Sequence, residues 1–153
     1  MRIVLQRVTE ASVEVDGDTV GRIGPGFLAL VGIQDGDTEP VARAMAAKTI
    51  GLRVFADETR SFHRSLEDIA GAVLVVSQFT LTADMRRGRR PGWRAASADV
   101  AEPLVTAYAD ALQADGVEVA RGVFGAAMRV HLCNDGPVTL VLDSAEVLAR
   151  GEP

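Results

Sequence analysis

The sequence predicts an α+β fold: one compact domain with a largely antiparallel or mixed, barrel-like β-sheet core and two main helices. Many short apolar runs are separated by turn residues, and hairpins dominate the first third of the chain. Two segments, residues 38–52 and 102–114, have the features of longer helices. The chain contains no Gly-x-Gly-x-x-Gly motif and no P-loop, so a doubly wound nucleotide-binding fold is not expected.

The first third of the chain is predicted to form strands. These are expected at residues 3–8, 12–15, 19–23 and 27–33. Asp16-Gly17-Asp18 supplies a hairpin turn between the second and third strands. Gly24-Pro25-Gly26 then breaks the chain before residues 27–33, an apolar run short enough to be a buried strand.

The middle of the chain is predicted to contain one helix and one buried strand. Thr38 can cap a helix that has Glu39 and Pro40 in its first turn, and residues 52–55 are expected to leave that helix as a strand. Residues 71–76 form the most β-branched run and continue directly into the polar segment 77–82. If that segment extends the strand, Gln78, Thr80 and Thr82 share one face.

The last third is predicted to contain the second helix and the final strands. Proline is tolerated in the first turn of a helix but not in its interior, so Pro103 places the start of the helix near Glu102. Asp115-Gly116 provides the stop after Ala114. Strands are then expected at residues 117–120, 128–133 and 138–143.

The final two strands are separated by Asn134-Asp135-Gly136-Pro137. Proline has no amide hydrogen and a fixed φ, so a strand that passes through it must bulge, turn or stop pairing. An ordinary hairpin turn is one interpretation, because Asn-Asp-Gly is favourable turn chemistry. A functional site is the other, because local rules fail most often at such sites.

Length and composition favour one globular domain over residues 1–153, with residues 151–153 as a loose tail. There is no apolar run of about 18 residues and no signal-peptide pattern, so a cytoplasmic protein without a membrane partner is expected. The single cysteine, Cys133, excludes an internal disulfide. Two histidines and one cysteine are too few for the usual zinc sites, and neither a metal nor a cofactor is expected.

The net charge of −5 argues against broad, nonspecific coating of nucleic acid, so any RNA contact must be local. One basic cluster exists, in a loop punctuated by glycine and proline: Arg86, Arg87, Arg89, Arg90 and Arg94, with Trp93 among them. Guanidinium groups can hold phosphates and the indole can stack on a base. The alternative is a solvated basic loop, or one paired with acidic side chains elsewhere.

Few side chains are placed for nucleophilic catalysis. Ser77, Gln78 and Thr80 can form a pocket wall or simply a satisfied sheet edge, and the Thr80 hydroxyl has no histidine or lysine near it in sequence to act as a base. His131 and Cys133 share a strand face, but their Cα atoms would be roughly 6.5 to 7 Å apart, too far for a good Cys–His hydrogen bond. Cys133 is therefore expected to pack in the core, and His63 to lie at the surface or at a pocket rim.

Two motifs closely resemble the signatures of the D-aminoacyl-tRNA deacylases: Ser77-Gln78-Phe79-Thr80-Leu81 and Asn134-Asp135-Gly136-Pro137-Val138-Thr139. The resemblance continues in order and spacing up to about Asp143, and includes Gln6-Arg7-Val8, Ala11-Ser12-Val13, Ile23-Gly24, Leu30-Val31-Gly32, Val75-Val76 and Arg90-Pro91. Each short match is modest evidence, whereas the two main motifs at this separation are highly specific.

The resemblance implies an esterase that removes D-amino acids, and often glycine, from the 3′ end of mischarged tRNA. It also implies a homodimer in which a cis Gly136-Pro137 pair enters the pocket of the partner subunit. There its carbonyl groups would hold the substrate amino group and leave no room for an L side chain. Asn134, Val138 and Thr139 complete this chiral-selection segment.

The same resemblance assigns the catalytic wall to Ser77, Gln78, Phe79 and Thr80, with backbone amides that can hold an oxyanion. Thr80 would act as nucleophile, or water would attack with help from the terminal ribose 2′-hydroxyl; the absence of a base near Thr80 favours water. Arg86, Arg87, Arg89, Arg90 and Trp93 would contact tRNA, and DNA is not an expected partner.

The chain departs from the family pattern at Phe62-His63, where relatives commonly have Met-Asn, and at Gly92-Trp93, where they often have Ser-Phe. These departures predict a changed substrate preference rather than lost activity. Two other functions stay open from the sequence: a non-catalytic RNA-binding module that uses the arginine loop, and a dimer that binds an amino-acid-like ligand without hydrolysing it.

Overall fold

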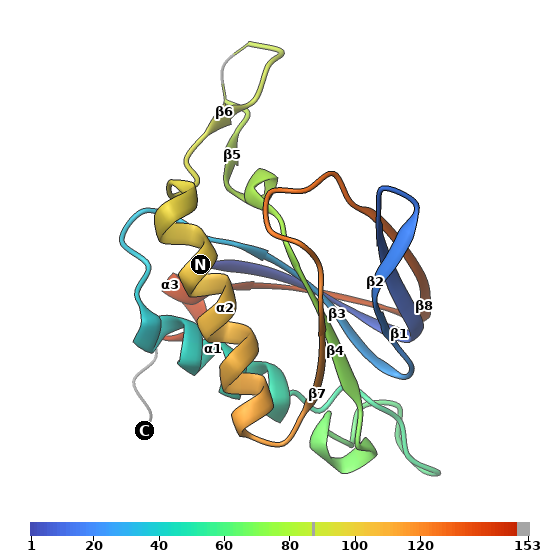
Figure 1. The fold of residues 1–153 in the computed structure, drawn as a ribbon. Coiled ribbons are helices and arrows are strands. Elements are labelled where there is room, and N and C mark those ends of the chain that lie inside the picture. Colours follow the sequence, from blue (N-terminus) through green and yellow to red (C-terminus); the bar gives the residue numbers. More distant parts are fainter. Residues whose placement is uncertain (87, 150–153) are drawn as a thin grey trace.

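The computed structural model describes residues 1–86 and 88–149, which include a mixed sheet, a small ribbon and helices (Figure 1). The strands are β1 (Arg2–Val15), β2 (Asp18–Ile23), β3 (Gly26–Gly32), β4 (Ala72–Ser77), β5 (Ala83–Asp84), β6 (Gly92–Trp93), β7 (Glu118–Arg121) and β8 (Arg129–Asp143). The helices are α1 (Glu39–Gly51), α2 (Ala98–Ala114) and α3 (Ser144–Val147), with short 3₁₀ turns η1 (Glu67–Ile69) and η2 (Phe79–Thr82). The predicted tail, 151–153, lies outside the described residues.

The large sheet has the order β2-β1-β3-β4-β7, and β8 pairs with β1 as an additional neighbour. Antiparallel pairing joins β1 to β2, β3 and β8, whereas β3, β4 and β7 run parallel. Parallel neighbours require long connections, and α1 and α2 lie within these connections. The sheet curves until its two edges approach: a Cβ built at Gly21 in β2 would lie 2.9 Å from the Arg121 carbonyl oxygen in β7. The mixed, barrel-like core is therefore confirmed.

The strands β3 and β4 are buried on both of their faces. Along β3, Phe27 and Val31 belong to the larger core cluster with residues of α1 and α2, whereas Leu28 belongs to a second cluster on the inner side of the curved sheet. This division follows from the alternation of side chains along a strand. The two long helices lie together on one side of the sheet (Figure 1).

A buried polar contact joins the two long helices. The hydroxyl of Thr49 in α1 donates to the Met45 carbonyl oxygen at 2.9 Å and lies 2.9 Å from the Tyr108 hydroxyl in α2. Both Thr49 and Tyr108 are fully buried, and burial raises the pKa of Tyr108. The contact gives the Tyr108 hydroxyl a partner that water cannot supply at this position.

The structure corrects the predicted start of the second helix. The helix α2 begins at Ala98, with Ser97 before it, so Pro103 lies inside the helix. The Ser97 carbonyl oxygen accepts the amide of Ala101 at 2.8 Å, and Ala101 and Leu104 are both buried. Burial of this face outweighs the hydrogen bond that Pro103 cannot donate.

Two predicted strand boundaries were also wrong. Residues 52–55 form no strand; the structure records a single bridge there, in which Phe55 and Arg64 exchange backbone hydrogen bonds at 3.0 and 2.9 Å. The Phe55 ring instead packs against Phe27, with centroids 5.0 Å apart. At the N-terminal end, residues 3–8 and 12–15 belong to one continuous strand, β1. Among the described residues, no helix is long and apolar enough to cross a membrane.

Candidate active site

The polar segment after β4 is a turn and not an extension of the strand. The amide of Gln78 donates to the Val31 carbonyl oxygen at 2.8 Å, and η2 begins at the next residue. The chain turns over Gly32, where an added Cβ would lie 3.0 Å from both the Gln78 carbonyl oxygen and the Leu81 Cβ. The prediction that Gln78, Thr80 and Thr82 share a strand face is therefore wrong.

Three carbonyl groups, from Gln78 to Thr80, accept hydrogen bonds from within the turn or from the residue directly after it. The Gln78 carbonyl oxygen accepts the Leu81 amide at 3.2 Å, and the Phe79 carbonyl oxygen accepts the Thr82 hydroxyl at 2.8 Å. The Thr80 carbonyl oxygen accepts the amide of Ala83. The first amides of such a turn have no acceptor within it, which leaves those of Phe79 and Thr80 for an oxygen atom from outside the turn.

Among the described residues, no base is hydrogen-bonded to the Thr80 hydroxyl. The side-chain amide of Gln78 donates a hydrogen bond to it. The two histidines of the sequence pair with carboxylates elsewhere, His63 with Asp57 at 3.5 Å and His131 with Glu14 at 3.3 Å. His63 is 43% exposed, in agreement with its predicted place at the surface.

A mostly apolar cavity of about 420 Å³ lies beside the turn. The sequence-predicted residues Ser77, Gln78 and Phe79 line it, and Thr80 is exposed next to them. The remaining wall comes from the ends of β3 and β4, the start of α2 and the segment that leads into β8: Val31, Ile33, Val76, Ala95, Ala96, Ala98, Ala101, Val105, Phe124, Gly125, Ala126, Met128 and Val130. A cavity of this size and apolarity suits a small organic group.

Sequence reasoning missed the α2 and pre-β8 walls of this cavity. A signal was present in the density of small residues, Ala95-Ala96 with Ala98 and Ala101, and Gly125-Ala126 between Phe124 and Met128. Small side chains leave space where larger ones would fill it. Their distance in sequence from Ser77 concealed that they face the same cavity.

The segment Asn134-Pro137 is a bulge within the continuous strand β8 and not a hairpin turn. Val8 of β1 pairs with Asn134 and Gln6 pairs with Thr139, so the four residues 135–138 lie opposite Arg7 alone. The peptide bond between Gly136 and Pro137 is cis, as the resemblance implied. Gly136 and Pro137 are exposed, while Val138 returns to the buried side.

Arg7 and Asn134 hold this bulge from both sides. The Arg7 guanidinium donates from Nε to the Asp135 carbonyl oxygen at 3.2 Å and lies 3.1 Å from the Asp135 carboxylate, and its Nη1 donates to the Val54 carbonyl oxygen. The Asn134 side-chain amide donates to the Arg7 carbonyl at 3.0 Å and to the Val138 carbonyl at 3.1 Å. The sequence named Arg7 only within the Gln6-Arg7-Val8 resemblance and gave it no role, although a charged residue inside the predicted strand 3–8 was an available signal.

Within one described chain, the two predicted motifs do not meet in a single cavity. The cavity beside η2 is lined by Ser77, Gln78 and Phe79 but by no residue of the segment 134–139. The bulge at Gly136 and Pro137 is instead directed toward solvent.

The arginine loop connects β5 to β6, and some of its arginines form ion pairs with an acidic residue. Asp84 lies 2.6 Å from Arg86 and 3.0 Å from Arg94, and hydrogen bonds from Arg86 hold the pKa of Asp84 well below its usual range. Arg90 lines a polar hollow with Pro91 beside this pair. The predicted contact residue Arg87 lies outside the described residues.

An exposed aromatic pair connects the ribbon to the turn. The rings of Phe79 in η2 and Trp93 in β6 have centroids 4.9 Å apart and are tilted by 59°. Both side chains are more than half exposed, Phe79 at 57% and Trp93 at 53%. The contact places the arginine loop beside the cavity.

The prediction that Cys133 packs in the core was wrong. Cys133 is exposed, as are His131 and Leu132 next to it. These residues lie in β8, which pairs with β1 at the outside of the sheet. The apolar residues of β8 therefore do not indicate that this strand is buried within one chain.

The fold and the site together define an α+β protein with an apolar cavity beside a 3₁₀ turn and an exposed bulge opposite an arginine. The model of the family described as D-Tyr-tRNA(Tyr) deacylase matches residues 4–143. The D-aminoacyl-tRNA deacylase of Roseiflexus castenholzii is 58% identical over 146 residues, which are 95% of this chain and 93% of that relative. The D-aminoacyl-tRNA deacylase of Syntrophotalea carbinolica is 55% identical over 148 residues, 96% of this chain and 99% of the relative.

Solved structures agree with these matches. The structure titled "c-Myc DNA Unwinding Element Binding Protein" aligns with a TM-score of 0.88 at 38% identity, over 94% of this chain and 98% of that one. A probable eukaryotic D-amino acid tRNA deacylase has the same fold, with a TM-score of 0.79 at 17% identity over 92% of this chain and 97% of that one. The chain therefore belongs to the D-Tyr-tRNA(Tyr) deacylase family, a family of hydrolases.

Proposed function

We propose that the protein hydrolyses the ester bond of D-aminoacyl-tRNA, and of glycyl-tRNA mischarged on tRNA(Ala), and so proofreads chirality in translation. The observation that carries the proposal is the position of the Ser77–Leu81 motif, whose turn borders an apolar cavity and presents amides without acceptors in the turn. Membership of the family supports the same activity. The reaction consumes water and releases the free amino acid and tRNA, in the cytoplasm.

The amides of Phe79 and Thr80 are proposed to hold the ester carbonyl oxygen as it gains negative charge. Hydrogen-bond donors fixed before the reaction stabilise such an oxyanion without reorganisation in the transition state. The internal hydrogen bonds of η2 keep the turn in one conformation. With a substrate in place, the apolar wall would limit water around these donors and so strengthen their interaction with charge.

Attack by water, assisted by the 2′-hydroxyl of the terminal ribose, is the proposed mechanism. The observed partner of the Thr80 hydroxyl is a donor amide, from Gln78, and not a base. A nucleophilic threonine needs a base to take its proton. An aminoacyl ester is activated enough to react with less help than an amide requires.

The bulge at Gly136 and Pro137 is proposed to enter the cavity of a second copy of the chain in a homodimer. Its exposure, and its separation from the cavity of its own chain, support this arrangement. The backbone carbonyls of Gly136 and Pro137 would receive the substrate amino group, and the space left would exclude an L side chain. Asn134 and Val138 hold the bulge through their hydrogen bond at 3.1 Å, and Thr139 anchors its far end to Gln6 at 3.3 Å.

The arginine loop is proposed to contact tRNA near its acceptor end. Asp84 already engages Arg86 and Arg94, so Arg89 and Arg90 are the described arginines to which we assign phosphate binding. Trp93 would stack on a base, with Phe79 supporting the indole from behind.

Parallel deacylation of D-Tyr-tRNA and L-Tyr-tRNA tests the proposal. We expect release of D-tyrosine while L-Tyr-tRNA stays charged. Ala126→Trp places a large side chain in the cavity that Ala126 lines. It should abolish release of D-tyrosine and serves as the negative control. Equal turnover of both substrates would refute the chiral assignment. Binding without turnover would favour the RNA-binding module or the ligand-binding dimer.

A further inference from the structure

We propose that Arg2 is a positioning residue for the turn η2, because its guanidinium holds the Leu81 carbonyl group of that turn. This inference rests on the proposed function, since the turn carries the amides assigned to the oxyanion. It adds a residue that lies far in sequence from both signature motifs.

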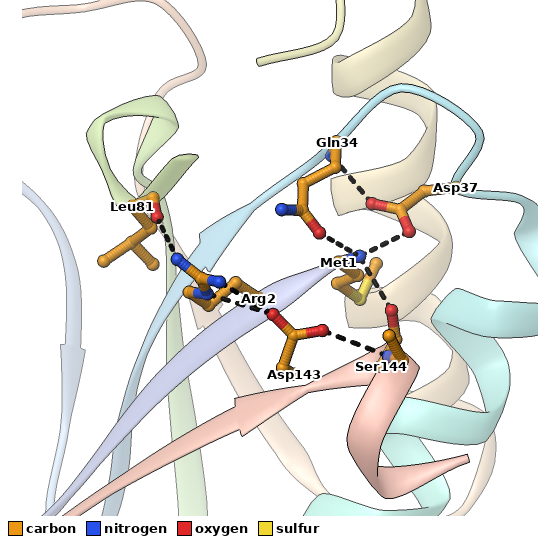
Figure 2. Close-up of polar contacts among 8 residues, drawn as sticks. Met1, Arg2, Gln34, Asp37, Leu81, Asp143 and Ser144 are labelled. Atoms are coloured by element: carbon orange, nitrogen blue, oxygen red, sulfur yellow. Dashed lines mark hydrogen bonds and ion pairs between the residues drawn. The ribbon is translucent and has the colours of Figure 1, made fainter. Parts of the chain in front are cut away.

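The contacts of Arg2 are directional (Figure 2). Its Nη1 donates to the Leu81 carbonyl oxygen at 3.0 Å. Its Nε and Nη2 donate to one carboxylate oxygen of Asp143, at 3.1 and 2.9 Å. The other carboxylate oxygen of Asp143 accepts the amide of Ala145 at 3.1 Å. The planar guanidinium is thus fixed by a carboxylate that is itself fixed at the start of α3.

The strand register explains why Arg2 reaches the turn. In β1, Arg2 pairs on one side with Gly32 of β3 and on the other with Asp143 of β8. Gly32 is the residue over which η2 packs, because it has no side chain to keep the turn away. Arg2 therefore lies between Gly32, which contacts the turn, and Asp143, whose carboxylate orients the Arg2 guanidinium.

The position of Leu81 makes this contact important for the site. The carbonyl groups of Gln78, Phe79 and Thr80 are bonded within or directly after the turn. Leu81 lies in the second half of the turn, one residue before its end at Thr82, and Arg2 gives the Leu81 carbonyl oxygen a charge-assisted partner. Without Arg2, this end of η2 would depend on water. The amides of Phe79 and Thr80 would then be less precisely oriented, and oxyanion stabilisation is sensitive to such orientation.

The test compares Arg2→Met, which keeps the aliphatic stem, with Arg2→Lys. For Arg2→Met we expect kcat on D-aminoacyl-tRNA to fall by about 10- to 100-fold, with KM within about 3-fold of the wild type. Arg2→Lys retains one donor group and should recover part of the loss. Arg43→Met removes an exposed arginine that lies 2.6 Å from Glu39 on α1, and should leave kcat unchanged. The melting temperature of each variant is measured in parallel.

If the unmutated protein turns over D-aminoacyl-tRNA and Arg2→Met has the same kcat, the inference is overturned and the proposed function stays intact. Loss of kcat that merely follows the unfolded fraction at the assay temperature would also overturn it. A wild type without turnover would refute the proposed function instead. Backbone amide exchange then decides separately: Arg2→Met should accelerate exchange across residues 81–83 by about 10-fold or more relative to β4, and equal exchange would refute the positioning role.

Discussion

At the scale of single residues, side chains hold the backbone of the candidate site in place. Thr80 is held by Gln78, the bulge by Arg7 and Asn134, and the Leu81 carbonyl by Arg2. Side chains in such roles change rates by altering geometry. Their removal should therefore reduce turnover without abolishing it.

Thr80→Ala is expected to lower kcat by about 10-fold and to leave measurable turnover, because the hydroxyl is not the assigned nucleophile. Thr80→Ser, which keeps the hydroxyl, serves as the matched variant and should be close to wild type. Single-turnover deacylation gives the rate, and filter binding gives the affinity. A Thr80→Ala protein that binds normally and has no turnover would contradict the water mechanism.

Gly136→Ala is expected to lower activity by at least about 10-fold. Gly136 has φ of +113°, and an added Cβ would collide with the Arg7 guanidinium and lie 3.2 Å from the Val138 Cγ2. Gly17→Ala is the matched control, because Gly17 also has a positive φ, of +91°, but no atom lies within 4 Å of an added Cβ. Both variants should lose some stability.

The measurement is kcat/KM together with the melting temperature for the two glycine variants. Similar losses of stability with activity lost in Gly136→Ala alone would locate function in the bulge. If Gly136→Ala retained wild-type turnover, the bulge would have only a structural role.

At the scale of elements, the contact between α1 and α2 has an asymmetric energetic consequence. Thr49→Val leaves the buried Tyr108 hydroxyl without its partner and should cost about 1–3 kcal/mol of unfolding free energy. Tyr108→Phe leaves the Thr49 hydroxyl bonded to the Met45 carbonyl oxygen and should cost about 1 kcal/mol. Urea unfolding measures both. The reverse order, with Tyr108→Phe the more damaging, would contradict this account.

The junction of β1, β8 and α3 predicts a pH dependence. Burial of the Asp143 carboxyl raises its pKa, but hydrogen bonds from Arg2 and from the Ala145 amide outweigh this, so the net pKa is lowered. An unfolded Asp titrates near about 3.9. Because the folded pKa is lower, ionised Asp143 stabilises the fold above that pH, and this stabilisation is lost as the pH falls through the folded value.

Melting temperatures across acidic pH values check this expectation. The wild type should lose stability below about pH 4, and Asp143→Asn should show a shallower decline. Asp35→Asn, at an exposed position, controls for the loss of one negative charge. A decline in Asp143→Asn as steep as in the wild type would show that the carboxyl does not contribute.

Strands and helices were predictable where local pattern and burial agree. The apolar run 27–33 became β3, and Thr38 with Pro40 marked the start of α1. Prediction failed where tertiary contacts override local rules, as when burial of Ala101 began α2 before Pro103. It also failed at η2, because Gly32, distant in sequence, allows the turn to pack there. The motif residues of the site were named from resemblance, but the alanine wall and Arg7 depend on which strands and helices become neighbours.

At the scale of the whole molecule, the separation of cavity and bulge within one chain gives a complementation test. One variant, Ala126→Trp, has a blocked cavity and an intact bulge; the other, Gly136→Ala, has an intact cavity and a damaged bulge. If the bulge serves the partner subunit, a mixed dimer contains one functional pair. Co-expression of the two impaired variants should therefore raise activity above that of either variant alone, up to about half of the wild-type value per mixed dimer.

The measurement uses two different affinity tags, so that mixed dimers can be isolated before the deacylation assay. Each variant paired with itself is the control. Mixed dimers without activity would indicate that each bulge serves its own chain.

The pairing of β1 with β8 has a consequence for synthesis of the chain. Arg2 contacts Asp143, 141 residues later, so the first strand made must wait for the last strand before its outer edge is paired. Contacts of such long sequence separation slow folding. The bulge opposite Arg7 is formed by the same late pairing. A nascent chain that has not yet released residues 129–143 from the ribosome therefore exposes the unpaired edge of β1 and lacks the bulge, and chaperones that bind strand edges have their longest opportunity at that stage.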